Sequence, residues 1–380
     1  MTAKKPIVLT AGGTGGHMFP AKALAAALVA RGHRVIVITD ARGIEYLSAA
    51  PDLEVHTVPA ASPAGGLLIK FSAAVQIGAG ILAARGKLRR FRPAIVIGFG
   101  GYPAFPAMVA ATRAGLPTLL HEQNALLGRV NRWLAPRVTA IATSFPETAG
   151  LTDGDIEKVT ITGNPVRDTF AAVRDLPYSA PDDGPLRLLV TGGSQGARIM
   201  SDVVPAALAS LDDDMRIRLR VTQQCRDEDL VRVEKIYADA GITADLATFI
   251  DNIPGLLATT HLAIMRAGAS SAAEIMAAGR PAILVPYMHA ADDHQAVNAR
   301  ALADKGAAWM MRQERFTELA CRESVEALLR DPRTLRDMAK KAHELGRVDA
   351  AERLADLVEA LALGGDKPLS VTKMAGKIAA

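Results

Sequence analysis

Two glycine-rich segments hold the residues best suited to chemistry. The first is IVLTAGGTGGHMFPA, residues 7–21, and the second is GGSQGAR, residues 192–198. Backbone N–H groups in such turns bind phosphate at the start of a helix, where the helix dipole favours negative charge. Ser194 and Gln195 add side-chain donors to the second segment. Each segment is therefore expected to hold a phosphate or diphosphate without a metal ion.

His17 stands directly after the glycines of the first segment. An imidazole titrates near neutral pH, which suits a general base. The same side chain also suits binding of a substrate phosphate, or capping of the helix that follows. The sequence leaves these roles open, and it offers Glu122 as a second candidate for the base.

The first segment departs from two familiar nucleotide-binding motifs. Gly13 and Gly15 begin a GxGxxG pattern, but Met18 stands where the third small residue is needed. The segment also lacks the GxxxxGK[ST] pattern of a P-loop. Asp40 ends the next predicted strand, where a dehydrogenase would keep its ribose-binding acid. We set the nicotinamide-dependent dehydrogenase aside and keep a tight turn without a ligand as the alternative to a diphosphate site.

Polar residues follow several other predicted strands. HEQN, residues 121–124, follows the strand PTLL, and GNPVR, residues 163–167, follows VTIT. Ligands of open α/β sheets bind at the carboxyl ends of the strands, so these groups are expected to outline one cleft. HAADDHQ, residues 289–295, contains two histidines and two aspartates that suit zinc. We favour a solvated loop there and expect no bound metal and no cofactor.

Alternating strands and helices must position these residues. IVLT, an amphipathic helix and RVIVITD form a βαβ unit, and residues 186–222 repeat that design. This alternation predicts an α/β fold with parallel sheets in two similar domains. We expect an N-terminal domain over 1–163 and a C-terminal domain over 164–345. A helix over 346–362 is expected to pack back on the first domain, and 363–380 to form a flexible tail.

Charge and composition limit the classes of function. The 380 residues are 49% hydrophobic and 22% charged, and two cysteines are too few for a disulfide framework. Residues 1–163 carry 17 Lys and Arg against 9 Asp and Glu, whereas the remainder carries 27 against 31. The basic half is expected to meet an anionic partner. Neither a secretory signal nor a transmembrane helix is expected, although residues 65–92 are apolar and basic enough to lie on a membrane.

Seven motifs, in order and approximate spacing, resemble the MurG family of bacterial glycosyltransferases, glycosyltransferase family 28. They are AGGTGGHMFPA, GFGGY, HEQN, TGNPVR, GGSQGAR, FIDN and HAADDHQ. The resemblance implies a GT-B fold, two Rossmann-like domains with parallel sheets facing across a cleft. It implies inverting transfer of N-acetylglucosamine (GlcNAc) from UDP-GlcNAc to the C4 hydroxyl of the MurNAc of lipid I, forming lipid II. A UDP-GlcNAc 2-epimerase of the same fold is the alternative.

The resemblance also assigns residues to the donor. Thr14, Gly15 and Gly16 match positions near the donor sugar and diphosphate. Ile250 matches the position whose backbone reads uracil, and Glu274 is expected to take the ribose hydroxyls. The complete set of expected donor-binding residues is Thr14, Gly15, Gly16, Asn124, Arg167, Ser194, Gln195, Ile250, Ala269, Glu274 and Gln295. His294 departs from the family, whose members often carry a second glutamine there.

The resemblance implies an acceptor held in a membrane, so the enzyme must dock on that membrane. Residues 65–92 are expected to form the docking surface. The expected docking residues are Leu67, Leu68, Ile69, Lys70, Phe71, Ile81, Arg85, Lys87, Arg89, Arg90 and Arg92. A buried helix followed by a solvated basic turn is the alternative. The implied partners are UDP-GlcNAc, lipid I (undecaprenyl-diphosphate-linked MurNAc-pentapeptide), anionic inner-membrane lipids and other proteins of cell-wall synthesis and division, with no nucleic acid. The implied place is the cytoplasmic face of the bacterial inner membrane.

Overall fold

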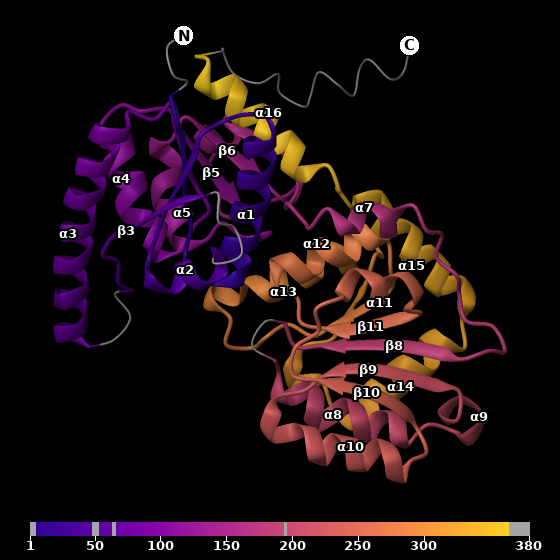
Figure 1. Ribbon diagram of the computed structural model, residues 1–380. Coiled ribbons are helices and arrows are strands. Elements are labelled where there is room, and N and C mark those ends of the chain that lie inside the picture. The colour runs from indigo at the N-terminus through magenta and orange to yellow at the C-terminus, as the bar shows by residue number, and fades with distance from the viewer. Residues whose placement is uncertain (1–4, 48–52, 63–65, 194–195, 365–380) are drawn as a thin grey trace, which may run out of the picture. The chain divides into compact units, whose positions relative to one another are not determined.

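The computed structural model describes residues 5–47, 53–62, 66–193 and 196–364. The chain divides into two compact units (Figure 1). Unit 1 comprises Met1–Val166 and Asp349–Ala380, and unit 2 comprises Arg167–Val348. The division therefore falls at Val166, against the residue 163 expected from sequence, and the C-terminal helix belongs to unit 1. The expected tail lies almost entirely outside the described residues.

Unit 1 is built on a parallel sheet with the strand order β3-β2-β1-β4-β5-β6-β7. Its strands are β1 (Ile7–Thr10), β2 (Val35–Thr39), β3 (Glu54–Thr57), β4 (Ile95–Gly98), β5 (Thr118–Glu122), β6 (Ala140–Thr143) and β7 (Val159–Ile161). Its helices are α1 (Gly15–Ala30), α2 (Ala41–Leu47), α3 (Leu67–Phe91), α4 (Phe105–Arg113), α5 (Arg129–Leu134), α6 (Asp153–Ile156) and α16 (Ala350–Ala362), with 3-10 turns η1 (Tyr102–Ala104) and η2 (Ala135–Arg137).

Alternate residues of the central strands face two different layers of helices. Ile7 and Leu9 of β1 join a buried cluster with α1 and α16. Val8, between them, joins a second cluster with α3, α4 and α5. Because successive strand side chains point to opposite faces, an uninterrupted apolar strand such as IVLT is buried on both sides. The parallel α/β architecture predicted from the sequence is confirmed in this unit.

Helix α16 is fastened to α1 by charge as well as by apolar packing. Arg31, just after α1, forms ion pairs with Glu352, Asp356 and Glu359 of α16. His33 Nε2 lies 2.6 Å from Glu359 Oε1. These partners hold the pKa of Glu359 below its ordinary value, chiefly through the hydrogen bond to His33. The last helix thus completes the layer over the β1 face of unit 1.

Unit 2 repeats the architecture with the strand order β10-β9-β8-β11-β12-β13 and parallel pairing. Its strands are β8 (Leu186–Thr191), β9 (Leu219–Gln224), β10 (Thr243–Ala247), β11 (Leu262–Met265), β12 (Ala282–Leu284) and β13 (Trp309–Met310). Its helices are α7 (Thr169–Arg174), α8 (Arg198–Ala209), α9 (Asp213–Arg216), α10 (Leu230–Asp239), α11 (Ile253–Thr259), α12 (Ala269–Ala278), α13 (His294–Ala303), α14 (Glu318–Leu329) and α15 (Pro332–Leu345), with η3 (Asp227–Asp229), η4 (Ala291–Asp293) and η5 (Gln313–Arg315).

Arg280 is a buried cation that ties helix ends together in unit 2. Its side chain donates hydrogen bonds of 2.7–3.3 Å to five backbone carbonyls. Two of these carbonyls belong to Leu257 and Ala258 in the last turn of α11, and two to Ala278 and Gly279 at the end of α12. Carbonyls in the last turn of a helix lack the usual partner four residues later, and the guanidinium supplies donors to them. Leu257 O also accepts from Thr260 N at 3.3 Å. Helix α12 is thereby held at its C-terminal end.

Candidate active site

The carboxyl ends of β1, β4 and β5 form one polar edge in unit 1, because these strands are neighbours in the sheet. The loop after β1 lies against the loop after β4, where Gly12 N donates to Gly100 O at 3.1 Å. Gly100 and Gly101 have φ of 83° and 75°, in the left-handed region that favours glycine. The HEQN segment completes this edge from β5.

His17 lies at this edge, in the first turn of α1, and is half-buried. A Cβ added at Gly12, Gly100 or Gly101 would come within 3.2–3.4 Å of the imidazole ring. The glycines therefore form a slot that the ring fills. The Nδ1 atom of His17 lies 3.0 Å from Gln123 Oε1. Packing and a hydrogen bond together fix the position of the imidazole.

The expected anion-binding residues of the first segment surround the start of α1. Thr14 is the N-cap residue, with extended backbone and an exposed side chain, and Gly15 and Gly16 are the first two helical residues. Gly15 is buried, and a Cβ there would meet the ring of Phe19 at 2.9 Å. The first N–H groups of a helix have no carbonyl partner four residues earlier, so those of Gly15 and Gly16 suit an anion. The N–H group of His17 instead donates to Thr14 O at 3.1 Å.

Glu122 is buried and holds a loop in place, whereas a general base would need to reach the substrate. The buried carboxylate accepts hydrogen bonds from Asn124 N and Nδ2, from Gly128 N and from Asn131 Nδ2, at 2.9–3.1 Å. Four donors occupy its two oxygens and fix the loop between β5 and α5. Asn124, the expected donor-sugar contact, is half-buried in this loop and oriented by Glu122.

In unit 2, the loops after the neighbouring strands β8 and β11 each lead into a helix. Gly193 and Gly196 have φ of 80° and 67°. Gly192 leaves room for the returning chain, since a Cβ there would lie 2.2 Å from Ala197 N. The N-cap of α12 is Gly268, and Ala269 is its first residue. The N-termini of α8 and α12 thus follow two neighbouring strands, whereas Ser194 and Gln195 lie outside the described residues.

Arg167 and Glu274 meet in unit 2. Arg167 Nη2 donates to Glu274 Oε1 at 3.3 Å, and Arg167 Nη1 donates to Asp251 O at 3.2 Å. Burial raises the pKa of Glu274, and the charge of Arg167 opposes that rise. Ile250 precedes Asp251 in the same loop and is half-buried. The expected uracil, ribose and phosphate residues of this unit therefore lie together.

The segment HAADDHQ is held by contacts that do not form a metal site. Gln295 Oε1 accepts from Tyr287 N at 3.0 Å, and His294 Nδ1 lies 2.8 Å from Ala291 O. Asp293 pairs with Arg312 at 2.7 Å. Within the part of the chain that the structure describes, no group of three or more His, Cys, Asp and Glu side chains is placed to hold a metal ion.

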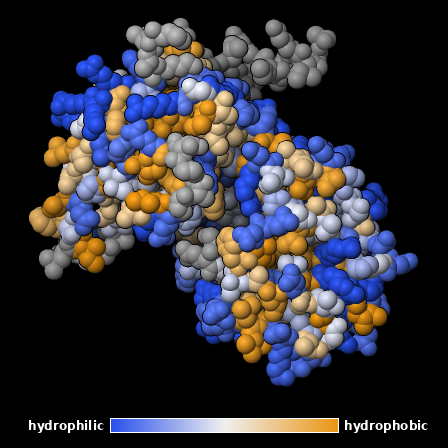
Figure 2. Space-filling model, viewed as in Figure 1, coloured by the Kyte–Doolittle hydropathy of each residue, from blue (hydrophilic) through white to orange (hydrophobic). Residues whose placement is uncertain are grey.

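The expected docking residues lie on or just after α3, which packs against α4. The side chains of Ile69, Phe71, Val75 and Leu82 are 53%, 73%, 58% and 69% exposed. Figure 2 shows hydrophobic residues on this flank of unit 1. Ile81 instead packs partly buried against the core, and the structure does not describe the side chains of Leu67 and Leu68. Among the described residues, no helix is long and apolar enough to cross a membrane.

The basic residues follow the apolar ones along the same helix. Lys70, Arg85, Arg89, Arg90 and Arg92 are exposed, and Lys87 is half-buried.

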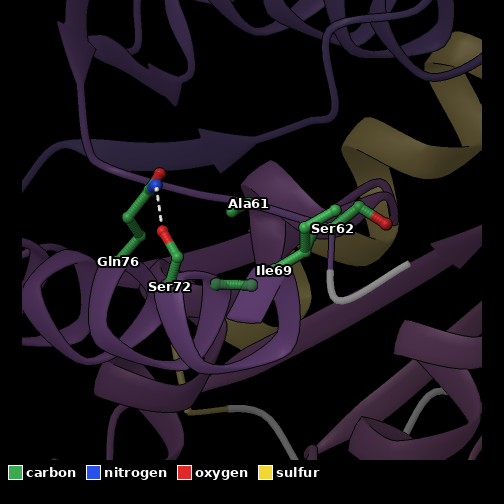
Figure 3. Close-up of a pocket in the computed structure, with 6 residues that line it drawn as sticks. Ala61, Ser62, Ile69, Ser72 and Gln76 are labelled. Atoms are coloured by element: carbon green, nitrogen blue, oxygen red, sulfur yellow. Dashed lines mark hydrogen bonds between the residues drawn. The ribbon is translucent and has the colours of Figure 1, made fainter. Parts of the chain in front are cut away.

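A small cavity opens beside the first turns of α3 (Figure 3). It has a volume of about 270 Å³ and is lined by Ala61, Ser62, Ile69, Ser72, Ala73 and Gln76. Gln76 Nε2 donates to Ser72 Oγ at 3.4 Å across one wall. The lining is mostly apolar, so the cavity extends the exposed hydrophobic surface of α3.

Three side chains of the site were not selected from the sequence. Gln123 contacts His17, and Asn131 connects α5 to Glu122 and to His121 O. Both polar atoms of the buried Asn164 side chain lack a hydrogen-bond partner among the described residues. Gln123 and Asn164 stand inside the HEQN and GNPVR motifs, so their position after strands was a usable signal. Asn131, on a helix, carried none.

Comparisons with known proteins bear on both units. The model of the glycosyltransferase family 28 N-terminal domain matches residues 7–143, and that of the C-terminal domain matches residues 187–354. A relative from Rhodospirillum centenum is 52% identical over 354 residues, 93% of each chain. One from Paramagnetospirillum magneticum is 50% identical over 95% of this chain and 98% of its own. Both are named UDP-N-acetylglucosamine–N-acetylmuramyl-(pentapeptide) pyrophosphoryl-undecaprenol N-acetylglucosamine transferase.

Solved structures of similar proteins cover nearly the whole chain as well. The crystal structure of Acinetobacter baumannii MurG matches with a TM-score of 0.77 and 30% identity, covering 93% of this chain and 99% of that one. A UDP-N-acetylglucosamine 2-epimerase from Listeria monocytogenes, described as putative, matches with a TM-score of 0.67 and 15% identity, over 97% and 99%. The second likeness is one of fold alone.

Proposed function

The chain belongs to glycosyltransferase family 28, and from this premise we propose that it transfers GlcNAc from UDP-GlcNAc to the C4 hydroxyl of the MurNAc of lipid I. The products are lipid II and UDP. The observation that carries the proposal is that relatives named for this reaction align with nearly the whole chain at about half identity. The fold is GT-B, with a Rossmann-like sheet in each unit.

We assign donor binding mainly to unit 2. The N-termini of α8 and α12 supply N–H groups and helix dipoles for the diphosphate, and Arg167 supplies a positive charge. Glu274 accepts the two ribose hydroxyls, and the backbone of Ile250 meets uracil. Gln295 lies near the loop after β12 and is assigned to the sugar hydroxyls. Stabilisation of the departing diphosphate by these groups lowers the barrier to transfer.

We assign the acceptor to unit 1, with His17 as the general base. In the transfer step the C4 oxygen of the acceptor forms a bond to the anomeric carbon of GlcNAc. The bond from that carbon to the diphosphate oxygen breaks, and UDP leaves with the electron pair. His17 takes the proton of the C4 hydroxyl. Binding of an acceptor phosphate is the second role that this position suits, because the start of α1 attracts anions.

We also propose that α3 docks unit 1 on the cytoplasmic face of the inner membrane. Phe71, Val75 and Leu82 recur at helical spacing and are exposed, and Arg85 and Arg89 continue their stripe. Apolar side chains enter the headgroup region, while each cation near an anionic surface contributes about 1 kcal/mol. Docking of this kind brings a membrane-held acceptor within reach of a peripheral enzyme.

Vesicle co-sedimentation tests the docking proposal. Phe71→Ser is expected to weaken binding to vesicles containing phosphatidylglycerol, and added salt is expected to weaken it further. Leu319→Ser is the matched control, since Leu319 is 59% exposed on α14 of unit 2. Binding that is indifferent to salt, to anionic lipid content and to Phe71→Ser contradicts docking through α3.

The transfer itself is tested by following UDP release with and without a lipid I analogue. A transferase is expected to release UDP only when the acceptor is present. Formation of UDP-N-acetylmannosamine without an acceptor would instead establish the epimerase. Glu274→Gln serves as an internal check, since it is expected to raise KM for UDP-GlcNAc more than it lowers kcat.

A further inference from the structure

We propose that Gln123 is a positioning residue that fixes the tautomer of His17, placing the proton on Nδ1 and the lone pair on Nε2. The proposal rests on the proposed function only for its effect on turnover. It follows from a chain of hydrogen bonds that runs from Gly163 through His121 and Gln123 to His17. Each link in this chain determines which atom of the next carries a proton.

The chain starts at a fully buried histidine. His121 Nε2 lies 3.1 Å from Gly163 O. A carbonyl oxygen only accepts, so Nε2 carries the proton and Nδ1 carries the lone pair. Burial lowers the pKa of His121 to about 4, so the ring is neutral at neutral pH. His121 therefore presents an acceptor, Nδ1, towards Gln123.

Three acceptors determine the orientation of the Gln123 amide. Gln123 Nε2 lies 3.0 Å from His121 Nδ1, 3.0 Å from Phe99 O and 3.1 Å from His121 O. The orientation of an amide is assigned from its hydrogen-bond partners. The reverse orientation would place the amide oxygen against three acceptors and leave the buried groups unsatisfied. The oxygen Oε1 must therefore be the atom that faces His17.

The last link fixes His17. Its Nδ1 atom lies 3.0 Å from Gln123 Oε1, which only accepts, so Nδ1 carries the proton. In the neutral ring the lone pair is then on Nε2. The glycine slot formed by Gly12, Gly100 and Gly101 limits rotation of the ring that would exchange the two nitrogens. Packing fixes the plane of the ring, and Gln123 determines which of its two nitrogens carries the proton.

This arrangement serves base catalysis in two ways. The nitrogen that receives the proton is the one that points away from the buried amide of Gln123. When Nε2 takes the proton, Nδ1–H remains hydrogen-bonded to Oε1, so the imidazolium that forms is stabilised by the amide dipole. The neutral amide of Gln123 orients the ring as a carboxylate does in other histidine bases, but it adds no negative charge to the site.

The tautomer is measurable by NMR on the full chain labelled with ¹⁵N-histidine, without substrate. Long-range ¹H–¹⁵N correlations at neutral pH distinguish a protonated ring nitrogen from an unprotonated one. The spectrum of His17→Gln identifies the His17 signals by their loss. We expect the proton of His17 on Nδ1 in the wild type and, because Gln123→Met removes the accepting oxygen, a shift towards Nε2–H in that variant.

A second variant and a matched control keep the test decisive. Gln123→Glu keeps an accepting oxygen opposite His17, and its second oxygen, which faces Phe99 O, His121 O and His121 Nδ1, is expected to hold a proton and donate it to one of them. This variant is therefore expected to restore the Nδ1–H tautomer that Gln123→Met loses. Gln313→Met makes the same change in unit 2 and is expected to leave the His17 signals in place. His17 with its proton on Nε2 in the wild type, or unmoved by Gln123→Met, overturns the proposal.

Kinetics then separate this inference from the proposed function. If His17 is the base, Gln123→Met is expected to lower kcat by about ten-fold or more with little change in KM for UDP-GlcNAc. Gln123→Glu is expected to recover part of that loss. A changed tautomer with unchanged kcat would leave the positioning of His17 established and refute its role as the base.

Discussion

The buried ring of His121 makes the stability of unit 1 depend on pH. Its pKa is lowered to about 4 in the folded protein, mainly by burial, from an ordinary value of 6.5 in the unfolded chain. When the pH falls below about 6.5, His121 therefore binds a proton in the unfolded chain but stays neutral in the folded protein. The contribution of neutral His121 to the free energy of unfolding is complete above pH 6.5, the pKa in the unfolded chain. It is lost as the pH falls towards about 4, the pKa in the folded protein.

The size of the effect follows from the two pKa values. Between about pH 7.5 and pH 5, the difference in proton binding costs about 2 kcal/mol of the free energy of unfolding. The full difference in pKa corresponds to about 3 kcal/mol. A loss of this size is a large fraction of the stability of a typical domain.

Urea unfolding followed by tryptophan fluorescence measures this loss in unit 1 alone. The chain has two tryptophans, Trp133 in unit 1 and Trp309 in unit 2. In a Trp309→Phe background, Trp133 reports on unit 1. His121→Gln is the matched non-titrating variant, because its amide can still donate to Gly163 O. Comparing the two proteins at each pH removes the contributions of other titrating groups.

The expected result is a pH-dependent gap between the two proteins. The His121 protein should lose about 2 kcal/mol more than His121→Gln between about pH 7.5 and pH 5. Equal losses would refute the assignment of a neutral, buried His121. They would also remove the first link of the hydrogen-bond chain that orients Gln123.

Three further outcomes are expected. Gly100→Ala should strain a left-handed backbone by about 1–2 kcal/mol and place a methyl 3.4 Å from His17 Cε1, so kcat should fall in the transfer assay while UDP-GlcNAc binding persists. Arg280→Met should leave carbonyls at the ends of α11 and α12 unpaired and lower the stability of unit 2 by about 3 kcal/mol, measured by Trp309 fluorescence. Exhaustive chelation should leave transfer intact, because we assign the diphosphate to backbone N–H groups and Arg167, and loss of activity restored by a divalent ion would contradict that assignment.

Local patterns were enough to predict the fold. Apolar strands such as IVLT and VIVIT, separated by helices and glycine turns, have few arrangements other than a parallel sheet with helices on both faces. The repeat of this unit after residue 186 predicted the second sheet in the same way. Helix α16 was predicted as a helix by its spacing, and in the structure Arg31 forms ion pairs with three of its carboxylates.

The chemistry of the site depended on contacts that sequence patterns do not carry. The position of His17 after the glycines was visible, but its hydrogen bond to Gln123 joins residues 106 positions apart. Glu122 was selected as an acid at a strand end, although four donors that include Asn131 now show it bracing a loop. Ile81 was chosen as surface because it is apolar, whereas the helix phase turns it towards the core.

The structure of the product tests the central claim most directly. Purified protein is incubated with UDP-GlcNAc labelled in the sugar and a lipid I analogue, and the product is analysed by NMR. We predict one disaccharide per UDP released, with GlcNAc β-linked to C4 of MurNAc and no such product from His17→Ala at comparable rate. An α-linkage, attachment at another hydroxyl, or labelled UDP-N-acetylmannosamine in place of a disaccharide would contradict the assignment.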